Sequence, residues 1–150
     1  MDLEKYEYST DNTFASFEFY SQGPNGQIRK VVNYTHIDTW PNGAMVFNLG
    51  FGDWDEHHQR INDLTVSNNK DRDKILATVA GTVLDFTNCY GTFPIVAKGS
   101  TAARTRLYQM GIAANLEVVE AHFSIFGLTP NGWEKFEKGR NFEAFLVIRK

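Results

Sequence analysis

The sequence predicts an α+β fold, with a mostly antiparallel sheet of about six to seven strands and two main helices in the order ββββαβαββ. Two patterns indicate this class. Short segments of alternating apolar and polar residues, separated by turns, come first. A helical period follows, interrupted by one short apolar segment. Separate strand-rich and helix-rich parts are typical of α+β proteins, and 150 residues predict a single domain spanning 1–150.

Four strands are expected in the first part, at residues 14–20, 28–37, 45–51 and 61–66. Gly23-Pro24-Asn25-Gly26 is a turn of hairpin length, and Pro41-Asn42-Gly43 makes the next turn. The polar run at 53–60 is expected to be a loop. Connections this short predict an antiparallel meander.

A helix is expected where apolar residues recur every three or four positions. This stripe consists of Ile75, Val79, Val83, Phe86 and Tyr90. Asp71 and Asp73 fall in its first turn, where the helix dipole favours acidic side chains.

The rest of the chain predicts a short buried strand at 94–97 and a second helix that starts near Thr101 and is capped by Gly111. A short further helix is expected at 113–121. Two closing strands are expected at 123–128 and 142–148, with a loop between them. The strand–helix–strand–helix middle predicts one right-handed parallel crossover within the sheet.

Composition and net charge argue against several classes of protein function. Hydrophobic residues make up 42% of the chain and charged residues 22%, as in ordinary globular proteins. Cys89 is the single cysteine, which excludes an intrachain disulfide and favours the reducing cytoplasm. The sequence holds no apolar run long enough to span a membrane, so no membrane association is expected. A net charge of −3 argues against a dedicated nucleic-acid-binding domain.

The chain lacks the common nucleotide, hydrolase and zinc motifs, so no catalytic residue, metal site or cofactor is predicted from them. Its most informative segment is the turn from Gly99 to Arg106, where a strand stops at a glycine and a helix begins. Two interpretations stay open. In the structural one, Ser100 caps the helix and Gly99 makes the turn.

In the functional interpretation, the same turn binds an anion. Backbone N–H groups at the helix start, the hydroxyls of Ser100 and Thr101, and the side chains of Lys98 and Arg104 would converge on a phosphate or carboxylate. Arg104 is the better ligand than Arg106, because the two lie about 200° apart on a helix. Tyr108 completes the expected ligand-binding set on this helix.

Two further segments carry polar groups of interest. Asn68 and Asn69 precede the first helix, either as a turn and cap or as amides that contact a ligand in the same cleft as Gly99. The acidic loop with His57 and His58 is expected to be a solvated loop, because its histidine spacing does not fit a metal site; metal binding or acid–base chemistry is the alternative.

The order of elements is similar to the core of the GNAT acyltransferase superfamily. Leu107-Tyr108-Gln109-Met110-Gly111-Ile112 also resembles a run that often ends the last helix of those enzymes. The resemblance implies a coenzyme A site in a Gly-rich loop before the first helix. Here that stretch, 66–73, has no glycine and carries two aspartates, which repel an anion.

The whole chain resembles a family of small bacterial proteins of unknown function from Bacteroidota. The matching sequence segments include residues 47–53, 65–69, 75–79 and 142–147, together with the decapeptide from Gly99 to Tyr108. This resemblance implies a bacterial cytoplasmic origin and brings no activity.

The sequence therefore leaves three functions open. The favoured one is a small cytoplasmic protein that binds an anionic, phosphate-bearing ligand at the turn after Gly99. One alternative is a diverged acyltransferase that uses coenzyme A, with Tyr108 as an acid. The other is a protein-interaction role in a toxin–antitoxin or phage-defence system, through exposed Trp loops and the acidic loop.

Overall fold

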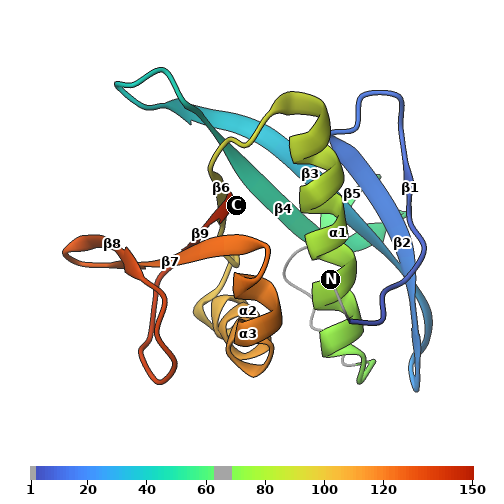
Figure 1. Ribbon diagram of the computed structural model, residues 1–150. Helices are drawn as coiled ribbons and strands as arrows, with labels where there is room; N and C mark the ends of the chain where they lie inside the picture. The colour runs from blue at the N-terminus through green and yellow to red at the C-terminus, as the bar shows by residue number, and fades with distance from the viewer. Residues whose placement is uncertain (1–2, 63–68) are drawn as a thin grey trace.

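The computed structural model describes residues 3–62 and 69–150, which form one mixed sheet and three helices (Figure 1). The strands are β1 (Ser9–Thr10), β2 (Ser16–Gly23), β3 (Gly26–Thr39), β4 (Met45–Asp55), β5 (Arg60–Asn62), β6 (Ile95–Ala97), β7 (Phe123–Thr129), β8 (Gly132–Lys135) and β9 (Phe145–Arg149). The helices are α1 (Arg72–Tyr90), α2 (Ala102–Ala114) and α3 (Leu116–Glu120). None of these helices is long and apolar enough to cross a membrane.

The strands lie in the order β1-β2-β3-β4-β6-β9-β7-β8, and β5 pairs with β4 beside this path. Among the described strands, β4 and β6 form the one parallel pair, and α1 connects them. The last strand of the chain, β9, lies between β6 and β7 and is antiparallel to both. The C-terminal strand is therefore central, where it contributes Phe145 to the core.

The β2–β3 hairpin sets which side chains face the helices. Its turn lies between Gly23 and Gly26, and Gly26 has a φ of +85°, which glycine adopts without strain. Alternation then places Phe17, Phe19 and Val32 on the helix-covered face, where each is at most 1% exposed.

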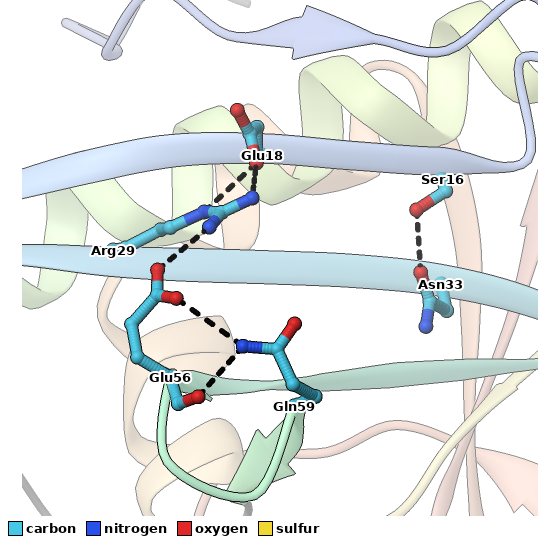
Figure 2. A network of polar contacts seen from close by, with 6 residues as sticks. All are labelled: Ser16, Glu18, Arg29, Asn33, Glu56 and Gln59. Atoms are coloured by element: carbon cyan, nitrogen blue, oxygen red, sulfur yellow. Dashed lines mark hydrogen bonds and ion pairs between the residues drawn. The ribbon is translucent and has the colours of Figure 1, made fainter.

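The opposite face of β2 and β3 is polar, as Figure 2 shows. Arg29 donates to Glu18 (Nε to Oε2, 2.9 Å) and to Glu56 (Nη1 to Oε1, 3.0 Å). Glu18 raises the pKa of the Arg29 guanidinium above its ordinary value. Ser16 donates to Asn33 at 2.7 Å on the same face. Val31 is the buried apolar side chain of this face, at 6% exposed, between Arg29 and Asn33 on β3.

An aromatic cluster joins α1 to the sheet. Phe86 stacks on Tyr34 with ring centroids 4.3 Å apart and meets Phe47 edge-on at 5.0 Å. The Tyr34 hydroxyl lies 2.8 Å from Oγ1 of Thr82, so the tyrosine is bonded although it is buried. Val83 and Phe86 of the predicted helical stripe lie in the core, which confirms the face of α1 that the sequence predicts.

The predicted count of six to seven strands and the order ββββαβαββ, taken as GNAT-like, are wrong. The described residues hold nine strands. β1 has two residues and β8 has four, and both are too short to show a period of two. β8 falls in the segment expected to be the closing loop, because residues 130 and 131 form a hairpin turn and Gly132 already pairs with Thr129.

Other boundaries also differ. The expected loop at 53–60 shrinks to a turn, because β4 continues to Asp55 and β5 starts at Arg60. Residues 63–66 of the fourth predicted strand lie outside the described residues. Gly111 does not cap α2, which continues to Ala114. A Cβ at Gly111 would lie 3.8 Å from Arg72, so this glycine is where α2 packs close to α1.

Candidate functional site

A cavity of about 1040 Å³ lies between α1, α2 and the sheet. Its size suits an organic ligand. The helix walls are apolar along most of their length, with Ile75, Leu76, Val79, Ala80 and Val83 from α1 and Leu107 and Ile112 from α2. The sheet wall consists of Leu49, Phe51, Ala97, Phe123, Ile125, Phe145 and Val147.

Charged side chains line the remainder of the cavity, and basic ones outnumber acidic ones among the described residues. The basic side chains are Lys30, Lys70, Arg72, Lys74 and Arg104, and the acidic ones are Glu4, Asp71 and Asp73. An anionic ligand is favoured by this balance.

The three acidic side chains already have partners within the protein. Asp71 Oδ2 accepts hydrogen bonds from the hydroxyls of Tyr6 (2.6 Å) and Ser21 (2.5 Å). Burial, and then donation to Asp71, raises the pKa of Tyr6, so this phenol stays a neutral donor. Asp73 accepts from Asn115 Nδ2 at 3.0 Å, and Glu4 accepts from Lys74 at 3.2 Å. The neutral donors orient Asp71 and Asp73, and Asp73 is also paired with Arg72 at 3.4 Å.

Arg104 reaches the cavity because of a tightly bonded turn. Thr101 is the N-cap of α2, and its Oγ1 accepts from the backbone N–H of Arg104 at 3.2 Å. The Gly99 N–H donates to Thr105 Oγ1 at 3.0 Å. A Cβ at Gly99 would lie 2.4 Å from the Thr105 nitrogen, so only glycine fits there. Arg104 is 7% exposed.

The predicted ligand-binding residues therefore divide into two groups. Asn69, Arg104 and Tyr108 line the cavity. Lys98, Ser100 and Thr101 are exposed at the surface of the turn, and Gly99 is buried within it. Thr101, rather than Ser100, caps the helix. The turn thus points its exposed groups and its arginine in different directions.

Asn69 is buried and fully engaged with the β2–β3 hairpin. Its Nδ2 donates to Ser21 Oγ at 3.1 Å and to Gly26 O at 2.9 Å, and its Oδ1 accepts from the Asn25 N–H at 2.7 Å. These bonds fix the hairpin to the start of α1, so the amide shapes the cavity. Asn68, its predicted companion, lies outside the described residues.

Sequence reasoning missed Lys30, which is 5% exposed and lines the cavity from β3. Its Nζ forms an ion pair with Asp53 of β4 and lies 5.9 Å from the centre of the Phe51 ring. A signal was present. Lys30 shares the inward positions of β3 with Val32 and Tyr34, where a charged residue is unusual.

The histidines of the acidic loop do not line the cavity. His58 Nδ1 lies 2.8 Å from Asp55 Oδ2, and this contact lowers the pKa of Asp55. Over residues 3–62 and 69–150, no group of three His, Cys, Asp or Glu side chains is placed to hold a metal ion. Of this loop, Asp53 alone bears on the cavity, through Lys30.

A family model matches residues 2–150, which is nearly the whole chain. The chain belongs to DUF6934, a family of unknown function. This membership agrees with the resemblance to a family of unknown function that the sequence shows. Comparisons with curated proteins and with solved structures found no match. Membership of DUF6934 assigns no ligand, so the function has to be argued from the cavity itself.

Proposed function

We propose that the protein binds an anionic, phosphate- or carboxylate-bearing ligand in the cavity between α1, α2 and the sheet. The observation that carries this proposal is that Arg104 and Lys30, each less than 10% exposed, line the same cavity. Nothing in it requires catalysis, and we propose a binding protein.

The physical argument rests on the energy of buried charge. Arginine and lysine are among the residues least often buried, because removing a cation from water is costly without compensation. Lys30 is compensated by Asp53. A cation at a cavity attracts an anion more strongly than it would at the surface, because the surroundings screen the charge less.

Each residue of the predicted set takes a role in this proposal. Arg104 supplies a planar set of donors suited to phosphate or carboxylate oxygens. Tyr108, half-buried in the wall, adds a hydroxyl near the ligand. Gly99, Thr101 and Asn69 hold the walls in place through their own hydrogen bonds.

Neither alternative function gains a specific observation. The stretch 66–73 before and at the start of α1 has no glycine, so it lacks the Gly-rich loop that would hold a coenzyme A pyrophosphate. Of the Trp side chains expected to anchor a partner, Trp54 packs against the Arg29 guanidinium at 5.1 Å. We therefore propose neither acyl transfer nor a dedicated protein-interaction role.

A thermal-shift experiment tests the proposal. Wild-type protein is heated with AMP, ATP, acetyl-coenzyme A and octyl phosphate in turn, each at millimolar concentration. We expect at least one anion to raise the unfolding temperature, since a ligand at a hundred times its Kd adds about 2.7 kcal/mol.

The chain offers a matched pair of variants for this experiment. Arg104→Met removes the buried cation, whereas Arg106→Met removes an exposed cation of the same helix that does not line the cavity. The stabilisation should disappear in Arg104→Met and persist in Arg106→Met. Equal stabilisation in both variants, or none in the wild type, would refute the proposal.

A further inference from the structure

We infer that the ligand is an amphipathic anion, with a charged phosphate or carboxylate head on a single hydrocarbon chain. This inference rests on the proposed function and specifies its ligand class. It comes from how polar and apolar side chains are distributed along the cavity.

The sheet wall changes character from one side to the other. Lys30 of β3 supplies its polar side chain, and Gln22 of β2 contributes backbone groups that bond the Tyr6 hydroxyl. The wall side chains from β4, β6, β9 and β7 are all apolar. Because the strands lie in the order β2-β3-β4-β6-β9-β7, the polar part is at one side of the cavity and the apolar part extends away from it.

The lining of α1 changes in the same way. Arg72, Asp73 and Lys74 in its first turn are charged, and the lining residues that follow, from Ile75 to Val83, are all apolar. At 1.5 Å per residue, the step from Arg72 to Val83 covers about 16 Å. The start of α1 is bonded to β2 through Asp71 and Ser21, so both polar regions lie together.

The apolar part can hold a hydrocarbon chain but not a sugar or a base. Its side chains, such as Val119, Ile125 and Val147, offer no hydrogen-bonding group. Its backbone groups are engaged in helices or strand pairs, as between β6 and β9. A polar group placed there would lose its hydrogen bonds to water without replacement. An alkyl chain has no such bonds to lose, so its transfer from water into the cavity is favourable.

The apolar wall also extends to the protein surface, where the hydrocarbon chain of a ligand can enter the cavity. Leu107 of α2 is 40% exposed, whereas Phe123 and Phe145 at the same cavity are at most 2% exposed. An apolar surface that continues from exposed to buried residues is expected where an apolar ligand enters.

Titration calorimetry on the full chain tests the inference with butyl, octyl and dodecyl phosphate, each kept below its micelle concentration. Two further probes keep an alkyl chain of similar length and change the head. Dodecanoate has a carboxylate head, and dodecyltrimethylammonium has a cationic head. We expect the affinity for alkyl phosphates to rise roughly threefold to fourfold per added methylene. Dodecanoate should bind within tenfold of dodecyl phosphate, and dodecyltrimethylammonium at least tenfold more weakly.

A cavity-filling variant adds a second readout. Val79→Trp fills the apolar part and should reduce the affinity for dodecyl phosphate at least tenfold, with little change for butyl phosphate. The wild-type series decides the inference even if this variant does not fold.

The outcomes separate the two proposals. Equal affinities for butyl and dodecyl phosphate would overturn the hydrocarbon-chain inference and leave the anion site standing. Equal affinities for dodecyl phosphate and dodecyltrimethylammonium would overturn the anion site itself. Absence of binding by every probe would overturn both.

Discussion

Thr101 Oγ1 accepts a hydrogen bond from the backbone N–H of Arg104 at 3.2 Å, so the residue that caps α2 also fixes the residue that lines the cavity. The bond sets where the first turn of α2 begins. Arg104 then falls on the inward face of the helix and Arg106 on the outward one. The capping bond thus links local backbone chemistry to the proposed binding site.

The cap itself is open to test. Thr101→Val removes the acceptor, and we expect the free energy of unfolding to fall by about 1 kcal/mol. Thr101→Ser keeps the hydroxyl and should lie much closer to the wild type. Urea denaturation measures both. A valine variant as stable as the serine variant would show that the cap contributes nothing.

Substitution by alanine should change the stability of the protein in opposite directions at Gly99, just before α2, and at Gly111, within α2. Gly99→Ala places a Cβ 2.4 Å from the Thr105 nitrogen, and relief of this clash should cost about 1–3 kcal/mol. Gly111→Ala adds a Cβ with ordinary contacts, the nearest at 3.8 Å, inside a helix. It should stabilise the protein by about 0.5–1 kcal/mol. Thermal unfolding of the two variants gives the signs, and the same sign for both would contradict the packing described here.

The free energy of unfolding should fall when the Lys30–Asp53 ion pair loses one partner and recover when both are replaced. Asp53→Asn leaves the ammonium of Lys30, 5% exposed, without its carboxylate, and should cost about 3 kcal/mol. The double variant Lys30→Met, Asp53→Leu removes both charges and should recover most of this loss. Chemical denaturation of the single and double variants measures the difference. A double variant less stable than Asp53→Asn would argue against this explanation.

The β7–β8 hairpin should give a pH-dependent contribution to stability. Donation from the Thr129 hydroxyl, at 2.6 Å, and then the Arg140 guanidinium, at 3.1 Å, hold the pKa of Glu134 below its ordinary value. The contribution is therefore present above the ordinary glutamate pKa and is lost as the pH falls through the lower folded pKa.

Glu134→Gln isolates this effect. The variant should be less stable than the wild type at pH 7, and the two should converge in acid once Glu134 is protonated. Urea midpoints measured from pH 7 down to pH 2 follow the difference. A difference that stays constant across that range would contradict the assigned contacts.

The sequence predicts the parts of the fold that depend on long local patterns. The stripe with Val83 and Phe86 places α1 and its buried face, since several turns repeat one period. The two-residue strand β1 offers no such repeat. Nor does local pattern reveal that β9 lies between β6 and β7, because that order depends on contacts between distant segments.

The same limit applies to the site. The turn at Gly99 is visible in the sequence as a glycine followed by hydroxyl residues and arginines. The sequence favours Arg104 over Arg106, and Arg104 is the one that lines the cavity, whereas the cap is Thr101 and not Ser100. The contribution of Lys30 depends on its register with Asp53 across β3 and β4, which no local pattern contains.

The most direct test of the central claim locates the ligand on the protein. Backbone amide NMR spectra of ¹⁵N-labelled protein are recorded during titration with octyl phosphate. Saturable shifts are predicted for Arg104, Tyr108 and Leu76 around the cavity, with little change at Arg29 and Asn33 on the opposite face. Saturable shifts confined to the opposite face, or none that saturate, would contradict an anion site in the cavity.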